Sequence, residues 1–136
     1  MAKRKIAIIV ALAIIIIGGY FGIKGIKSYT DLRTYRRQVN EISISEVDLS
    51  KVGDGTYTGA YEVLWVAAEV KVTVKDHKIK EIELVHHKHD RGIEAEVIPG
   101  RVVEAQSLEV DVITGVTSSS KVILKAIENA LNSGMK

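Results

Sequence analysis

The stretch VKVTVKDHKIKEIEL, residues 70–84, decides the fold of this chain. Its first half alternates valine with charged or hydroxyl side chains, and apolar residues recur in its second half at Ile79, Ile82 and Leu84. Alternation with a period of two is typical of a strand that buries one face. Residues 76–78 supply the polar side chains of a tight connection. We therefore predict an antiparallel β-hairpin at the centre of the folded part.

The flanking residues predict the other elements. Residues 56–58 favour extended chain after a turn. Residues 93–106 carry helical spacing, which Pro99 should break or kink. Residues 108–113 are short and apolar and predict a strand, whereas 118–131 repeat apolar residues with the 3.6 period of an amphipathic helix. The predicted class is α+β, a small antiparallel sheet with packed helices.

The N-terminal region predicts one transmembrane helix before the domain. Residues 6–23 contain no charged side chain and can cross a hydrocarbon core of about 30 Å. A basic tail, 1–5, precedes them, and a juxtamembrane linker or helix continuation, 24–52, leads to a single domain at 53–136. A cleaved signal peptide would share the basic start and apolar run, but no Ala-x-Ala pattern follows. We expect an uncleaved, single-pass anchor in the cell membrane, with the domain extracytoplasmic because the leading tail is short.

Charge and composition exclude several classes of protein. The net charge of +2 combines a net +7 in residues 1–37 with a net −5 in residues 38–136. The basic part suits the anionic head groups of a lipid bilayer, and the acidic remainder argues against a nucleic-acid partner. The chain has no cysteine, so disulfides, Fe–S clusters and thiolate zinc sites are excluded.

The segment before the last predicted helix is rich in hydroxyl groups. It reads Thr-Gly-Val-Thr-Ser-Ser-Ser over residues 114–120. The first amides of a helix are unpaired and lie at its positive end, so such a segment can bind a phosphate. The alternative is an ordinary N-cap, for which serine and threonine are common. The residues alone leave both interpretations open.

The same segment resembles a known family. Asp111-x-x-Thr114-Gly115-x-Thr117, followed by a hydroxyl pair and a helix, is similar to the FMN-binding domain family. That family includes the flavoprotein subunits of the sodium-pumping NADH:quinone reductase and of the related ferredoxin-linked complex. The resemblance covers about residues 53–131, with its parts in order. The upstream matches are 54–59, 70–82, His89, Gly92 and Ala95.

The resemblance implies a cofactor and a mode of attachment. In that family the last threonine of the motif receives flavin mononucleotide (FMN) as a phosphoester from a separate Mg-dependent flavin transferase that uses FAD as donor. Carried over, Thr117 is the acceptor, and Val116 stands where alanine is usual, which leaves non-covalent FMN open. The predicted cofactor-binding residues are Thr117, Thr114, Gly115, Val116, Ser118, Ser119, Asp111, His89, Trp65 and Tyr61.

The aromatic and histidine residues have competing interpretations. Tyr61 and Trp65 could stack on the flavin ring, or they could pack the sheet. The segment His-His-Lys-His at 86–89 invites a metal site. On an extended segment, however, His87 shares a face with Val85 and His89 while His86 points away. We expect a solvated polar loop at 86–92 and no metal. The family resemblance instead places His89 near the flavin.

Together these features predict a stand-alone, membrane-anchored flavoprotein. It would relay electrons between a membrane redox partner, such as a dehydrogenase subunit, and a quinone or external acceptor. No second redox centre is recognisable, so we expect an electron carrier or subunit rather than a self-contained enzyme. A sensor or adaptor with non-covalent FMN is the alternative. A third possibility, an anchored structural protein with a Ser/Thr-rich cap, is disfavoured by the ordered motifs.

Overall fold

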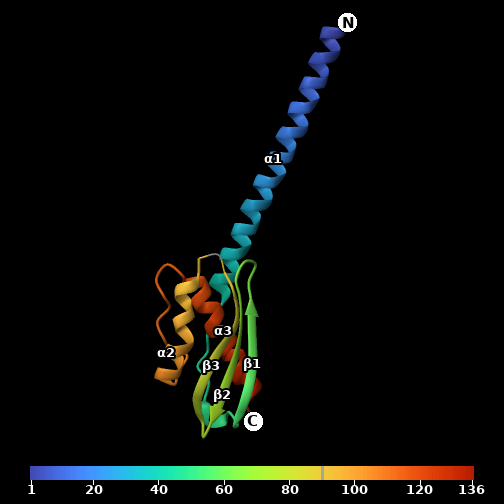
Figure 1. Ribbon diagram of the computed structural model, residues 1–136. Coiled ribbons are helices and arrows are strands. Elements are labelled where there is room, and N and C mark those ends of the chain that lie inside the picture. Colours follow the sequence, from blue (N-terminus) through green and yellow to red (C-terminus); the bar gives the residue numbers. More distant parts are fainter. Residues whose placement is uncertain (90) are drawn as a thin grey trace. The chain divides into compact units, whose positions relative to one another are not determined.

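The computed structural model describes residues 1–89 and 91–136. They divide into two units, residues 1–36 and 37–136. The element order is α1 (Ala2–Glu41), η1 (Leu49–Lys51), β1 (Gly55–Glu62), β2 (Ala67–Lys75), β3 (Lys78–Lys88), η2 (Ile93–Val97), α2 (Ile98–Ala105) and α3 (Thr117–Ser133) (Figure 1).

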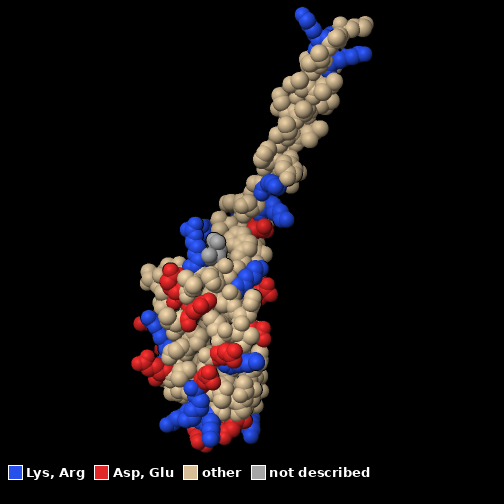
Figure 2. Space-filling view, viewed as in Figure 1, with Lys and Arg blue, Asp and Glu red and all other residues tan. Residues whose placement is uncertain are grey.

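The first unit is a single helix, the N-terminal part of α1. Residues 1–30 are all exposed, although 6–23 are apolar. The helix is long and apolar enough to cross a membrane, and a signal sequence would satisfy the same criterion. Figure 2 shows basic side chains before and after an uncharged stretch. Within the predicted linker 24–52, the helix continues to Glu41, and η1 follows at Leu49–Lys51.

The second unit is built on a three-stranded antiparallel sheet in the order β1-β2-β3. The predicted hairpin is therefore confirmed as β2 and β3. Its loop holds Asp76 and His77 at φ 53° and 59°, the left-handed backbone of a two-residue hairpin turn. The Asp54 carboxylate accepts the Asp76 N–H at 2.8 Å, so the end of the hairpin is tied to the start of β1.

Helix α3 packs on one face of this sheet (Figure 1). Alternate β2 residues, among them Val70, Val72 and Val74, are buried on that face. Gly59 on β1 lies against α3 so closely that a Cβ would be under 3.0 Å from backbone atoms of Ala126 and Ala130. A residue without a side chain is required for this approach of helix to strand. The α3 residues in the core are Val122, Ile123, Ala126, Ile127, Ala130 and Leu131.

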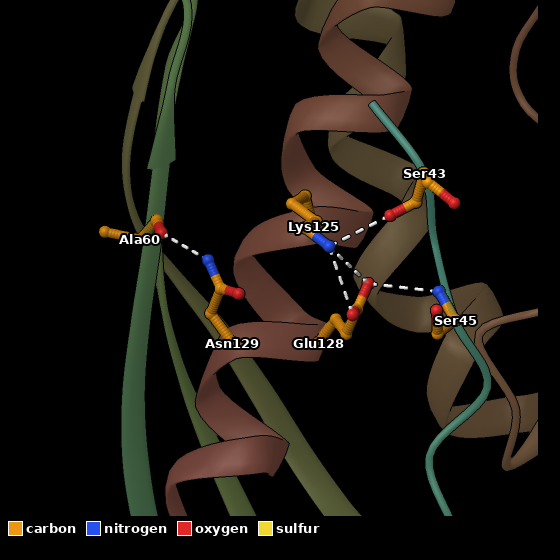
Figure 3. Close-up of polar contacts among 6 residues, drawn as sticks. All are labelled: Ser43, Ser45, Ala60, Lys125, Glu128 and Asn129. Carbon is orange, nitrogen blue, oxygen red and sulfur yellow. Dashed lines mark hydrogen bonds and ion pairs between the residues drawn. The ribbon is translucent and has the colours of Figure 1, made fainter. Parts of the chain in front are cut away.

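A buried polar contact joins α3 to the segment after α1 (Figure 3). Glu128 is only 5% exposed, and its carboxylate binds Lys125 Nζ at 3.1 Å and the Ser45 N–H at 3.1 Å. Lys125 also donates to the Ser43 carbonyl at 2.9 Å. A buried carboxylate is tolerated when it is paired and hydrogen-bonded, so these contacts fix residues 43–45 on the helix.

The structure corrects the prediction of a strand at residues 108–113. No strand forms there, although Leu108 is buried. Glu46 accepts the Leu108 N–H at 3.2 Å and also binds the Ser107 hydroxyl, while the Ser120 hydroxyl accepts the Ile113 N–H at 3.1 Å. Side chains thus satisfy backbone groups that a neighbouring strand would otherwise pair.

The polar loop predicted at 86–92 is also partly wrong, because β3 continues to Lys88. A β-bulge makes this possible: Leu84 pairs with Val70 and His86 with Glu69, which leaves Val85 as the extra residue. Val85 is 43% exposed, whereas the His87 side chain is 2% exposed. The sequence had suggested that Val85 and His87 share a face of the strand. The difference in exposure shows that they do not. Asp90 lies outside the described residues.

The predicted break at Pro99 takes the form of a change of helix type. Residues 93–97 form the 3₁₀ helix η2, and α2 begins at Ile98 with the proline in its first turn. Proline is favoured there because the first helical amides need no partner within the helix.

Candidate functional site

The open turn, residues 113–117, leads into α3, and no side-chain cap forms where the helix begins. The helix begins at Thr117, and its N-cap, Val116, makes no side-chain capping hydrogen bond. The interpretation of residues 114–120 as an ordinary Ser/Thr cap is therefore not realised. Among the described residues, no side chain caps the first amides of this 17-residue helix, and these amides lie at its positive end, where an anion is stabilised.

The backbone before α3 is shaped to leave this end accessible. Gly115 has a φ of +87°, which is costly for a residue with a side chain. The Val116 N–H donates to the Ile113 carbonyl at 3.1 Å and closes the turn. Gly115 and Thr117 are exposed, as are Asp111 and Thr114. Among the described residues, the Thr117 hydroxyl has no hydrogen-bond partner.

Ser120 holds the turn in place, a role that the sequence did not reveal. It is fully buried. Its hydroxyl donates to the Val116 carbonyl at 2.9 Å and accepts the Ile113 N–H at 3.1 Å. The side chain thus connects the first turn of α3 to the loop before it, which fixes the backbone on both sides of Gly115.

A second polar cluster lies beside the same turn. His87 Nε2 is 3.1 Å from the Ser119 hydroxyl, and His87 Nδ1 is 3.1 Å from the Glu96 carboxylate. Burial, opposed by the hydrogen bond to Glu96, lowers the pKa of His87 below its ordinary value. At neutral pH the ring is therefore uncharged, and it connects β3, η2 and α3 through one hydrogen-bonded chain.

His89, predicted to lie near the flavin, belongs to this second cluster. Its ring lies 4.4 Å from that of His87, centroid to centroid, and its Nε2 is 3.8 Å from Glu96. Its Nδ1 accepts the Gly92 N–H at 3.1 Å. Gly92 packs so tightly on Ser119 that an added Cβ would be 2.8 Å from the serine Cβ. Glu96 was not among the predicted site residues, because nine positions separate it from His87.

The two predicted aromatic residues lie at the end of the sheet that also carries His87: Tyr61 pairs with Ala68, and Ala68 pairs with His87. Trp65 is 42% exposed in the loop between β1 and β2. Tyr61 lines a cavity of about 400 Å³ together with Ala68 and His86, and no residue of 111–117 lines that cavity.

Another cavity adjoins the loop before α3. It measures about 390 Å³ and is lined mainly by apolar side chains. Val112 of the loop contributes to it, as does Lys121, which is one helical turn after Thr117 and hence on the same side of α3. The other lining residues are Ile42, Ser43, Ile44, Glu46, Leu108, Glu109, Val110 and Leu124.

The comparison with known proteins now decides the family. The model of the FMN-binding domain matches residues 64–132, about half of the chain, and this match includes the open turn and α3. The chain belongs to the FMN-binding domain family. Its cofactor is FMN. The donors at the start of α3 fit this cofactor, because unpaired amides at a helix N-terminus suit a phosphate group.

One relative shares more of the chain. An uncharacterized protein of Treponema pallidum (strain Nichols) is 28% identical over 102 residues, which cover 73% of this chain and 27% of that protein. The chain therefore spans about a quarter of the length of the curated relative that it matches.

Proposed function

We propose that this FMN-binding domain is held at the extracytoplasmic face of the cell membrane by α1 and carries FMN as a phosphoester on Thr117. One observation carries the proposal. The Thr117 hydroxyl is exposed and without a partner among the described residues, and it occupies the first residue of the uncapped helix α3. A hydroxyl in that position lies beside the amides that would hold the phosphate.

Attachment needs a partner enzyme, because no described side chain is hydrogen-bonded to the Thr117 hydroxyl as a base would be. In the transfer, the Thr117 oxygen forms a bond to the FMN phosphorus of FAD, the pyrophosphate bond breaks, and AMP leaves. The proton of the hydroxyl passes to a base of the Mg-dependent flavin transferase. The positive φ of Gly115 turns the chain so that the hydroxyl is reachable from solvent.

The residues around Thr117 would then hold the cofactor. The first amides of α3 would bind the phosphate oxygens, and Ser120 would keep the turn rigid. The apolar cavity that includes Val112 and Lys121 offers a surface for the flavin ring, with a cation at its edge. Bound FMN supplies one- and two-electron chemistry, and the protein sets its position and surroundings.

We further propose that the protein relays electrons rather than converting a substrate by itself. Its partner on one side would be a membrane reductase, and on the other a quinone or an external acceptor. Two features support a carrier role. The Thr117 site is exposed to an approaching partner, and a covalent bond would prevent loss of FMN outside the cytoplasm.

Intact mass spectrometry tests the attachment. The full-length chain is co-expressed with a flavin transferase, purified in detergent and denatured. We expect a mass gain equal to FMN minus water and in-gel flavin fluorescence. Thr117→Val keeps the shape of the side chain and should remove both signals, whereas Thr117→Ser keeps a hydroxyl and should retain them. An unmodified wild-type protein would overturn the phosphoester.

A non-covalent FMN sensor or adaptor is the second candidate, and Val116 favours it. Its half-buried side chain adds two methyl groups beside Thr117, which could obstruct the transferase. A yellow native protein that loses all flavin on denaturation would support this candidate. Reoxidation of the dithionite-reduced protein by a soluble quinone, followed by absorbance, separates a carrier from a sensor that does not turn over.

Protease accessibility in intact cells tests the location. A domain outside the cytoplasm should be cleaved by added protease, and a cytoplasmic marker protein should survive. Protection of residues 53–136 until the cells are lysed would show that the extracytoplasmic placement is wrong.

A further inference from the structure

The cluster of His87, His89 and Glu96 has the composition and convergence of a metal site. One nitrogen or oxygen from each residue lies within 4.8 Å of the others. His87 Nδ1 and His89 Nε2 are 3.1 and 3.8 Å from the same Glu96 oxygen. In a tetrahedral zinc site with bonds of about 2.0–2.1 Å, neighbouring ligand atoms are about 3.3 Å apart. Small side-chain shifts would therefore complete the geometry.

We propose that His87, His89 and Glu96 bind one divalent transition-metal ion, with Zn²⁺ as the reference ion. Two imidazoles and a carboxylate suit zinc and its neighbours in the first transition row, whereas Mg²⁺ and Ca²⁺ prefer oxygen ligands only. Three protein ligands leave a fourth position for water or another small ligand. This site is distinct from the Thr117 site and does not depend on the proposed flavin attachment.

Three elements of the fold bring the ligands together. The bulge at Val85 turns His87 towards α3, and η2 supplies Glu96 from a position nine residues later. The Ser119 hydroxyl then lies 3.1 Å from His87 Nε2. A metal-binding histidine usually donates its second N–H to an acceptor that fixes its tautomer. Ser119 occupies that position, so it would orient His87 without touching the ion.

The protons can be followed at each nitrogen. Without metal, the single proton of the neutral His87 ring would lie on Nδ1 and face Glu96, and Nε2 would accept from the Ser119 hydroxyl. When the ion binds Nδ1, the ring proton moves to Nε2, and Nε2–H donates to the Ser119 oxygen after the hydroxyl rotates. His89 would bind through Nε2, which moves its proton to Nδ1. The Gly92 N–H now donates to Nδ1, so metal binding must release this amide. The loss of one hydrogen bond costs far less free energy than a bound zinc ion contributes.

The same atoms also follow the order of a Ser-His-acid catalytic triad, but Ser119 is badly placed for nucleophilic attack. Its side chain is buried, with a relative exposure of 3%, and Gly92 packs directly on it. A substrate carbonyl could not reach the hydroxyl without displacing Gly92. Glu96 and His89 are by contrast 42% and 22% exposed, so an ion can enter from solvent.

Metal titration of the full-length chain in detergent tests the proposal. After EDTA treatment and its removal, Zn²⁺ binding is measured by calorimetry, and Co²⁺ by the visible absorption bands of a tetrahedral or five-coordinate ion. We expect saturation at one equivalent. His87→Ala and Glu96→Gln should weaken binding at least about 100-fold and abolish the Co²⁺ bands, and Ser119→Ala should weaken it about tenfold.

Two controls keep the test decisive. His86→Ala alters a neighbouring histidine that pairs opposite Glu69 and so faces away from the cluster, and it should bind as the wild type does. Glu96→Gln keeps the shape of an exposed side chain and should leave the circular dichroism unchanged. Absence of saturable binding by the wild type at about 100 μM Zn²⁺, or full retention of binding in both His87→Ala and Glu96→Gln, would overturn the proposal.

Discussion

Gly59→Ala should destabilise the domain strongly, although it adds a single methyl group. The new Cβ would lie 2.7 Å from the Ala130 Cβ and under 3.0 Å from backbone atoms of Ala126 and Ala130. Carbon atoms normally pack about 3.5–4.0 Å apart, so β1 and α3 must separate by roughly 1 Å. A gap of that size forfeits about a quarter to a half of each dispersion contact across it.

The expected loss follows from this separation. Overpacking of a well-packed core costs about 1–3 kcal/mol. Because the clash involves backbone atoms that cannot rotate away, we expect the upper end, about 3 kcal/mol, which is roughly a 100-fold change in the folding equilibrium. With an m-value of about 1.5 kcal/mol/M, the urea midpoint should fall by about 2 M. Fluorescence of Trp65, the chain's one tryptophan, follows the transition in detergent.

Gly100→Ala is the matched control. A Cβ at this position in α2 meets nothing within 4 Å, so alanine should stabilise the helix by about 0.5–1 kcal/mol. If Gly59→Ala lowers the midpoint by less than about 0.5 M while Gly100→Ala behaves as expected, the close contact between β1 and α3 described here is incorrect.

Three further predictions concern polar contacts and packing. Glu128→Ala should cost about 2 kcal/mol, because Lys125 loses its charged partner; Glu128→Gln should cost less in the same urea titration. Burial, the largest effect, raises the pKa of Glu46, but hydrogen bonds led by that from Ser107 outweigh it and lower this pKa below 4.5. Stability should therefore be full above that pH and fall as the pH drops through the lowered value, with a flatter profile in Glu46→Gln. Gly92→Ala should lower the melting temperature, because its Cβ would collide with Ser119; a melting curve equal to that of the wild type would show that this packing is wrong.

The sequence predicted the elements that depend on local periodicity. The alternating valines of β2 and the helical repeat of 118–131 each bury one face, so their patterns were sufficient. Residues 108–113 have a similar apolar pattern, yet they pair with the side chains of Glu46 and Ser120. Apolar character marks a segment as buried, but it does not show which partner satisfies its backbone.

The candidate sites were predictable to different degrees. The turn at Thr117 is contiguous in sequence, so its glycine and hydroxyl residues marked it as a candidate, although the residues alone left an ordinary N-cap as the alternative. The His87 cluster instead depends on a bulge in β3 and on η2, which brings Glu96 back to the strand. Side-chain alternation does not show where a strand has a bulge, nor that a carboxylate nine residues later lies beside the strand. The contacts of His87 with Glu96 could therefore be found only in the folded structure.

The bulge in β3 has a consequence for how this family is aligned and how its members diverge. Val85 is an extra residue between two inward-facing positions, Leu84 and His87. Deleting it would convert the bulge into a regular ladder and leave both neighbours on the same face as before. Homologues one residue shorter here can therefore retain the histidine in place, and a gap belongs at Val85. A one-residue change between the two register shifts of β3, at residues 81–84, would exchange His87 for His86.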